Sequence, residues 1–262
     1  MSIKKFKEKY GPFALVAGGS YGLGAAYAEA LASRGLNLVL IARGKERLTE
    51  TADRLREQYS VTVHAIAADL ADFENVKKQL SALDVSIGLL VYNAAFAIIE
   101  LFENATEEDL AMASYVNVRA PLLLTKLLSP KMIQNKRGGI VLMSSLAGAQ
   151  GTPKIATYVS TKAFNAILAE GLWKELKPHG VDVLGCVAGA ILTPGYQQAE
   201  KGKPAPGTLS PKEVAEQTLK ALGKGPIVVP GRFNRVIRFI LIRFLTRKAA
   251  INLITNMTGG LS

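Results

Sequence analysis

Short apolar runs recur along the chain, and segments with the signals of helices separate them. Each run has the length of a buried strand, bounded by glycine, proline or small polar residues. Seven such runs cover residues 13–17, 36–42, 61–67, 89–92, 139–143, 182–187 and 227–229. Strands that alternate with helices predict a parallel sheet covered on both faces, so the pattern favours the α/β class.

The intervening helices are marked by their ends. An alanine-rich segment runs to the end signal Arg34-Gly35, and Thr106 with Asp109 can cap a helix that reaches about Arg119. Residues 210–213 (SPKE) form a capping box with proline at the first helical position. Further helices are expected at 45–59, 74–83, 122–132, 156–177 and 210–222.

Length and composition predict one domain over residues 1–262. The chain is 49% hydrophobic and shows no linker and no repeat. A single cysteine (Cys186) excludes an internal disulfide, and two distant histidines make a metal site improbable. The N-terminus is basic but lacks an apolar core of signal-peptide length, so we expect a cytoplasmic protein.

The net charge of +11 is concentrated at the two ends of the chain. Glu216 is the last acidic residue, and eight cations follow it; residues 1–10 add +3. The middle of the chain is therefore neutral. Because nucleic-acid binders usually place basic residues among aromatics on the main face, this distribution argues against a nucleic-acid partner.

The basic C-terminal segment, 231–262, is expected to be an amphipathic helical extension. Phe233, Ile237, Ile240 and Phe244 fall on one helical stripe, with Arg235, Arg238 and Arg243 directed away from it. Arginines interrupt the segment too often for a membrane span. It can contact a membrane surface through 232–248, or it can pack on the domain, line a pocket or join subunits. We favour the packing alternatives.

A glycine-rich turn follows the first strand. Gly18, Gly22 and Gly24 form the pattern GxxxGxG between that strand and a helix. Glycine there lets the backbone approach a pyrophosphate, which the helix N-terminus attracts. A tight turn would need glycine for its own reasons, but this position near the N-terminus favours dinucleotide binding.

The second strand ends in Ala42 and Arg43, with no acidic residue before Glu46. Many nicotinamide-binding folds carry an acid here for the ribose 2′-hydroxyl. A cation suits a 2′-phosphate instead, so NADP(H) is predicted over NAD(H). The alternative is that Arg43 merely begins the next helix.

Tyr158 and Lys162 are spaced to lie one turn apart on a helix, and Ser145 follows the strand 139–143. An ammonium beside a phenol favours the phenolate, so we expect the pKa of Tyr158 to fall toward working pH. Such a tyrosine can exchange a proton with a reacting oxygen, which Ser145 can hold. Alone, YxxxK would more often be a solvated Tyr/Lys pair.

Residues 12–230 resemble the short-chain dehydrogenase/reductase family. Four motifs fall in the right order: the glycine turn 18–24, Asn93-Ala94-Ala95, Asn117, and Ser145 with Tyr158 and Lys162. The resemblance implies a doubly wound seven-stranded sheet, a homodimer or homotetramer, and a small-molecule substrate. Departures at Ala17, Tyr92, Ala95 and Ala188 fall on turns that brace the cofactor.

The resemblance also implies roles. Tyr158 would be the acid/base, Ser145 would orient the substrate oxygen, Lys162 would hold the nicotinamide ribose, and Asn117 would support a proton-relay water. Asp69 would meet the adenine, Asn93 the ribose, and Ile191 with Thr193 the nicotinamide. The full set of expected cofactor positions is Gly18, Ser20, Tyr21, Gly22, Leu23, Gly24, Arg43, Asp69, Leu70, Asn93, Ala94, Tyr158, Lys162, Gly189, Ile191 and Thr193.

The substrate pocket is predicted to be apolar, and the loop 195–209 is expected to close over it. Its expected residues are Ala95, Phe96, Leu146, Gln150, Pro153 and Tyr196. None is charged, so we expect an uncharged, fairly apolar carbonyl compound or secondary alcohol. Two alternatives come from other classes: a catalytically silent cofactor sensor or scaffold, and a membrane-surface protein that acts through its C-terminal helix.

Overall fold

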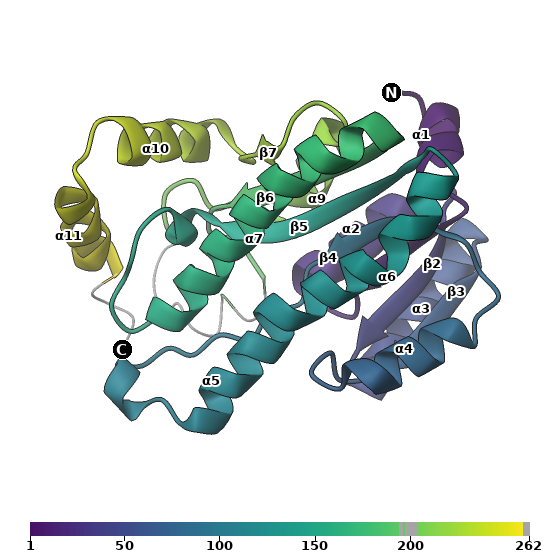
Figure 1. The fold of residues 1–262 in the computed structure, drawn as a ribbon, viewed down its shortest axis with the longest axis horizontal. Coiled ribbons are helices and arrows are strands. Elements are labelled where there is room, and N and C mark those ends of the chain that lie inside the picture. The colour runs from purple at the N-terminus through teal and green to yellow at the C-terminus, as the bar shows by residue number, and fades with distance from the viewer. Residues whose placement is uncertain (194–195, 197–203, 259–262) are drawn as a thin grey trace.

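The computed structural model describes residues 1–193, 196 and 204–258. Its centre is a parallel seven-stranded sheet in the order β3-β2-β1-β4-β5-β6-β7 (Figure 1). The strands are β1 (Phe13–Ala17), β2 (Asn37–Ala42), β3 (Val63–Ala67), β4 (Ile87–Tyr92), β5 (Gly138–Ser145), β6 (Val181–Ala188) and β7 (Ile227–Val228). The expected doubly wound sheet is confirmed, and the order reverses between β1 and β4.

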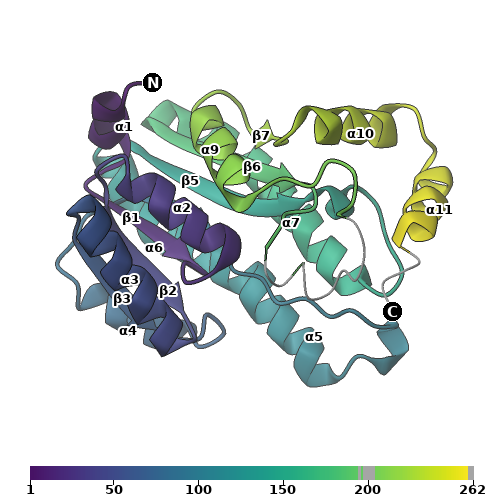
Figure 2. The same ribbon diagram turned by 180° about the vertical axis from the view of Figure 1, so that it is seen from behind.

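Helices cover both faces of the sheet (Figures 1 and 2). On one face lie α2 (Gly22–Ala32), α3 (Lys45–Tyr59) and α9 (Pro211–Ala221); on the other lie α4 (Phe73–Ser81), α6 (Ala120–Gln134) and α7 (Ala156–Leu176). Along β1, Ala14 and Val16 join the first core while Leu15 and Ala17 join the second. This alternation is why the strand runs are apolar throughout.

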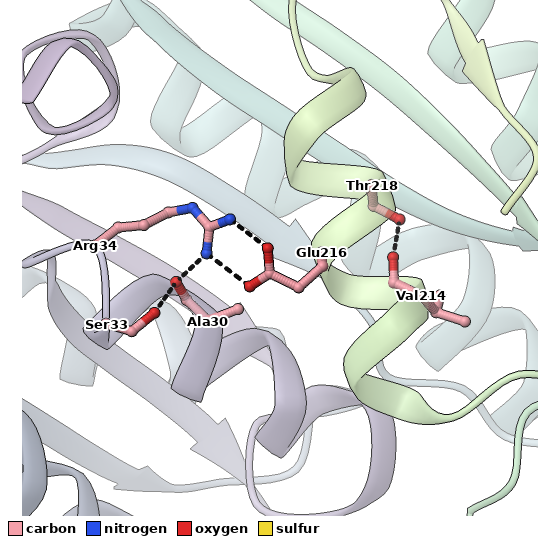
Figure 3. A network of polar contacts seen from close by, with 6 residues as sticks. All are labelled: Ala30, Ser33, Arg34, Val214, Glu216 and Thr218. Atoms are coloured by element: carbon pink, nitrogen blue, oxygen red, sulfur yellow. Dashed lines mark hydrogen bonds and ion pairs between the residues drawn. The ribbon is translucent and has the colours of Figure 1, made fainter. Parts of the chain in front are cut away.

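A network of polar contacts joins α9 to α2, the helix that follows the glycine turn (Figure 3). The Arg34 guanidinium donates to both carboxylate oxygens of Glu216, at 3.0 and 2.6 Å, and to the Ala30 carbonyl at 2.6 Å. The hydrogen bond with Arg34 lowers the pKa of Glu216. The residue expected only to end α2 therefore also holds α9 against it.

An N-terminal helix, α1 (Ile3–Tyr10), was not anticipated from the basic terminus. Tyr10 is fully buried, and its hydroxyl donates to the Asp182 carboxylate at 2.6 Å. Lys9 pairs with the same carboxylate. Together these contacts fix α1 beside the start of β6.

The C-terminal segment forms two helices, α10 (Arg232–Arg243) and α11 (Arg247–Thr258), which extend beyond the sheet (Figure 1). The predicted stripe is not buried as one face, since Phe233 is 48%, Ile240 37% and Phe244 72% exposed. Phe244 lies outside the helix because α10 ends at Arg243. Among the described residues, no helix is long and apolar enough to cross a membrane.

The remaining helical segments are short: α5 (Glu107–Ser114), a π-helical turn (Tyr115–Arg119), and 3-10 turns at Phe102–Asn104, Leu146–Ala149 and Lys177–His179. The expected single helix from Thr106 is thus α5 followed by the π turn. Thr106 does cap it, because its hydroxyl accepts from the Asp109 amide at 3.1 Å.

Candidate active site

A cavity of about 1360 Å³ opens at the carboxyl ends of the strands. It lies where the strand order reverses, which is the usual ligand position in open α/β sheets. Its wall extends from the end of β2, past the glycine turn and the ends of β4, β5 and β6, to the C-terminal helices. One cavity therefore contains both the expected cofactor positions and most of the expected substrate positions.

The glycine turn after β1 packs against the end of β4, the neighbouring strand in the sheet. Gly18 has a φ of +79°, a conformation that favours glycine. A Cβ on Gly24 would lie 1.8 Å from the Gly18 carbonyl oxygen and 2.8 Å from the Asn93 amide nitrogen. Gly24 thus lies behind the cavity wall rather than on it, and its small size allows the turn to present the N-terminus of α2.

Asn93 closes this arrangement from the β4 side. Its side-chain amide donates to the Gly18 carbonyl at 3.2 Å, and the backbone amides of Asn93 and Ala94 donate to the Ala17 carbonyl at 3.0 and 2.9 Å. The departure at Ala17 costs none of these bonds, because the accepting group is its backbone carbonyl.

Two arginines line the cavity at the end of β2. Arg43 lies there as expected, and Arg47 lies in the first turn of α3, 4.4 Å from the centre of the Tyr21 ring. Sequence analysis missed Arg47, whose only signal was its place in the first turn of the helix that follows β2. Glu46 and Glu50 line the same end, so this part of the cavity carries both signs of charge.

The other expected cofactor positions lie on the same wall. Asp69 follows β3, and its carboxylate accepts from the Ala71 amide at 2.9 Å. The expected positions on the wall, besides Gly18 and Arg43, are Ser20, Tyr21, Gly22, Leu23, Asp69, Leu70, Asn93, Ala94, Gly189, Ile191 and Thr193.

Ser145, Tyr158 and Lys162 meet at the cavity wall, from the end of β5 and the first turns of α7. Ser145 is hydrogen-bonded to the Tyr158 phenol. Lys162 is 4% exposed, and its ammonium donates to the Met143 carbonyl at 3.3 Å and lies 5.4 Å from the centre of the Tyr158 ring. Ser144 secures this turn of α7, since its hydroxyl donates to the Lys162 carbonyl at 2.7 Å.

The expected lowering of the tyrosine pKa is not what the structure shows. Burial raises the pKa of Tyr158, and the hydrogen bond with Ser145 opposes that rise only in part. Burial also lowers the pKa of Lys162 to about 8. The prediction considered the two charges alone, whereas both groups are withdrawn from water and each resists ionisation.

Asn117 lies behind the cavity wall, in the π-helical turn, and is 1% exposed. Its side chain accepts from the Phe96 amide at 2.8 Å and donates to the Phe96 carbonyl at 2.7 Å and to the Thr161 hydroxyl at 3.1 Å. Asn165 donates to its backbone carbonyl at 3.1 Å. The side chain therefore ties the segment after β4 to α7 at Thr161, the residue before Lys162.

Five of the six expected substrate positions line the cavity: Ala95, Phe96, Leu146, Gln150 and Tyr196. Pro153 does not, because it is exposed at the surface beyond the wall. Most of the loop 195–209 lies outside the described residues. Tyr196 is placed, and its amide donates to the Thr193 hydroxyl at 3.2 Å while its phenol oxygen accepts from the Ala205 amide at 3.2 Å.

The C-terminal helices supply the part of the wall that sequence analysis assigned to no particular residue. Phe233, Asn234, Ile237 and Leu241 of α10 line the cavity, as does Ile254 of α11. Asn234 is 4% exposed and donates to the carbonyls of Gly207 and Pro230, both at 3.0 Å. The outer side of α10 is exposed, with Val236 at 56% and Phe239 at 57%.

Among the described residues, no group of three or more His, Cys, Asp and Glu side chains could hold a metal ion. The chemistry of this wall is that of a phenol, a hydroxyl and an ammonium beside a glycine turn. Those groups can move a proton at an oxygen atom while a nucleotide lies along the turn.

Comparison with known proteins identifies the class to which this arrangement belongs. Residues 12–204 match the family model for short chain dehydrogenases. The chain is 32% identical to a very-long-chain 3-oxoacyl-CoA reductase of Phaeosphaeria nodorum over 264 residues, covering 95% of this chain and 76% of that protein. It spans 64% of the like-named reductase of Pyrenophora tritici-repentis.

Solved structures give the same result. A structure from work on 7beta-hydroxysteroid dehydrogenase stereoselectivity superposes with a TM-score of 0.89 at 26% identity, covering 95% of this chain and 98% of that one. A short-chain dehydrogenase from Sphingobium yanoikuyae in complex with NADPH has a TM-score of 0.74 at 33% identity, covering 84% and 87%. The chain therefore belongs to the short-chain dehydrogenase/reductase family and is an oxidoreductase.

Proposed function

We propose that this enzyme transfers a hydride between NADP(H) and the carbonyl or secondary alcohol of an uncharged, mostly apolar substrate, with Tyr158 as the acid/base. The observation that carries the proposal is the meeting of Ser145, Tyr158 and Lys162 on the wall of the cavity that also contains the glycine turn.

The cavity wall fits a dinucleotide. The close packing of Gly24 against Gly18 lets the turn present the N-terminus of α2 to the cavity, where backbone amides and the helix dipole favour the anionic pyrophosphate. Arg43 and Arg47 offer cations for a 2′-phosphate, and a structural neighbour at 33% identity carries NADPH. The carboxylates of Glu46 and Glu50 would repel a 2′-phosphate. We therefore assign the contact with the 2′-phosphate to Arg43 and Arg47.

The residues around the reacting oxygen have separate tasks. Bound NADPH supplies the hydride. The raised pKa of Tyr158 keeps its phenol protonated at neutral pH, so it can donate a proton to the oxygen that gains charge. Ser145 donates a hydrogen bond to the same oxygen. The Lys162 ammonium stabilises the phenolate that Tyr158 becomes when it gives up its proton. This protonation state suits the reductive direction.

The substrate end of the cavity is apolar. Phe96, Leu146, Ile237, Leu241 and Ile254 contribute to its wall. A volume of about 1360 Å³ exceeds the roughly 300–1,000 Å³ of a typical small-molecule site, which leaves room for a bulky substrate beside a dinucleotide. The similar proteins named above are a 3-oxoacyl-CoA reductase and a hydroxysteroid dehydrogenase. Both names refer to enzymes that act on a ketone or a hydroxyl group carried by a large molecule.

The C-terminal helices first serve this pocket. The inner side of α10 lines it, while the outer side carries Val236 and Phe239 among Arg232, Arg235 and Arg243. We propose that the outer side joins subunits of a homodimer or homotetramer in the cytoplasm. Peripheral contact with an anionic membrane is the second candidate, favoured by the basic residues among exposed aromatics.

The experiment that tests the proposal follows NADPH absorbance with a panel of uncharged ketones, in parallel with NADPH binding by fluorescence. We expect oxidation of NADPH with bulky apolar ketones and much weaker activity with NADH. A protein that binds NADPH tightly and reduces none of the panel would instead be the silent sensor or scaffold.

A further inference from the structure

Gln150 is a buried polar side chain that the mechanism above does not use. It is 4% exposed and lines the cavity just after the 3-10 turn that follows Ser145. Within the part of the chain that the structure describes, neither its carboxamide oxygen nor its carboxamide nitrogen has a hydrogen-bond partner. A buried amide left unpaired on both sides is costly, and most buried polar groups in proteins are satisfied.

The orphaned amide is specific to this position. Thr125, Thr152 and Asn165 also carry unpaired buried atoms, but none of them lines the cavity. The nearby amides do pair: Asn234 donates to two backbone carbonyls, and Asn117 forms both bonds with the Phe96 backbone. Those two side chains hold the structure together, whereas the Gln150 side chain holds nothing among the described residues.

The backbone beside Gln150 is fixed by other groups. The Arg247 guanidinium at the start of α11 donates to the Ala149 carbonyl at 2.6 Å. The Ser145 hydroxyl accepts from the Ala147 amide at 3.2 Å. These contacts place the backbone beside Gln150, so its carboxamide is not needed to hold the chain here.

We propose that Gln150 recognises a second oxygen on the substrate, a hydroxyl or carbonyl separate from the one that reacts at Tyr158. This proposal rests on the proposed function and specifies its substrate class as a bifunctional apolar molecule. A carboxamide offers both donor and acceptor, so it fits either group. Among the described residues, the cavity's cations are Lys162, bonded to Met143, and the arginines at the β2 end. We therefore expect the second group to be uncharged.

The proposal is tested with matched ketones that differ by one hydroxyl. The probes are cyclohexanone with 4-hydroxycyclohexanone, and 1-decalone with 5-hydroxy-1-decalone. For the unmutated enzyme, kcat/KM should be about 10- to 100-fold higher for the hydroxyketone of at least one pair, the scale of one buried hydrogen bond. Gln150→Met, which keeps the volume, should bring that ratio close to one, whatever its effect on reduction of the plain ketone.

A control and a second measurement keep the test decisive. Leu146→Met alters the same wall without touching the amide, so the hydroxyketone ratio should stay as in the unmutated enzyme. If Gln150→Met fails to fold, inhibition of the unmutated enzyme by decalin-1,5-diol and by 1-decalol replaces it, and the diol should bind at least about 10-fold more tightly. A hydroxyketone ratio that is the same in Gln150→Met as in the unmutated enzyme, or equal inhibition by the diol and by 1-decalol, would overturn the role of Gln150. Ketone reduction by the unmutated enzyme would still leave the proposed function standing.

Discussion

The two ends of the cavity are built in different ways. At the nucleotide end, the tightly packed glycine turn sets the shape of the wall on which Arg43 and Arg47 lie, and one added methyl at Gly24 would fall 1.8 Å from a carbonyl oxygen. At the substrate end, side chains of α10 and α11 form the wall, and the outer side of α10 is exposed. The first end tolerates little change because its shape is that of the main chain; the second can vary with its side chains while the chemistry between them is retained.

The largest effect is expected at Gly24. Gly24→Ala should lower NADPH affinity by more than ~100-fold, because the turn must open to accept a Cβ in a tightly packed place. Fluorescence titration measures it. Gly171→Ala is the matched control, since a Cβ there meets nothing within 4 Å. NADPH affinity equal in the two variants would remove the distinction between a backbone-built and a side-chain-built end.

The next effect separates the two sides of α10. Ile237→Asn, on the cavity wall, should raise KM for an apolar ketone by roughly 10-fold or more through lost apolar contact, while Phe239→Asn, on the exposed side, should not. Steady-state kinetics at saturating NADPH provide the comparison. If the two substitutions raise KM alike, α10 acts on the pocket through its overall stability rather than through its inner side.

Removal of α10 and α11 together tests whether the C-terminal segment serves the pocket and the fold or a membrane surface. Deletion of residues 233–262 should impair folding, assembly or substrate binding more than it changes association with anionic vesicles. The measurements are melting temperature, light scattering and vesicle sedimentation at two salt concentrations. A truncated protein that stays active and unchanged in oligomeric state, yet no longer sediments with vesicles, would make the membrane contact the segment's main role.

A smaller effect is expected at the nucleotide end from a side chain. Arg43→Ala should weaken NADPH binding by about 10-fold, the lower part of the range for a charge-assisted hydrogen bond, because Arg43 is exposed. NADH binding should be nearly unchanged. Similar NADPH and NADH affinities in the unmutated enzyme would contradict the assignment of the 2′-phosphate to this end.

The smallest effect is a pH dependence. Burial lowers the pKa of Lys162 to about 8 in the free protein, and bound phosphates favour the ammonium, so NADPH binding raises that pKa. Affinity should therefore be constant below about pH 7 and fall as the pH rises through 8, by at most about 10-fold per pH unit. Lys162→Met should lose this dependence. A Kd that stays level between pH 7 and 9 in the unmutated enzyme would show that the ammonium does not take part in binding.

The contrast between the two ends also explains what the sequence could predict. The strands and the glycine turn were predictable because each is encoded locally, by apolar runs and by the spacing of Gly18, Gly22 and Gly24. The meeting of Ser145, Tyr158 and Lys162 followed from one strand end and one helical turn. Helix α1 was missed because its anchor, the bond from Tyr10 to Asp182, joins residues far apart in sequence.

The C-terminal wall was predictable only as an amphipathic helix. The hydrophobic pattern of 232–248 allows several faces, and only the packing of α10 on the domain shows that Phe233, Asn234, Ile237 and Leu241 line the cavity. The pKa of Tyr158 was predicted in the wrong direction for a related reason. Sequence spacing reveals a neighbouring charge, but the loss of water around both groups depends on the whole fold.

The most direct test of the proposed chemistry compares turnover and cofactor binding in Tyr158→Phe. The substitution removes only the phenol oxygen that is hydrogen-bonded to Ser145. We expect NADPH affinity to remain nearly unchanged and kcat for any accepted ketone to fall by ~100-fold or more, the scale of a lost general acid. Full turnover in this variant would contradict the assignment of Tyr158 as the proton donor.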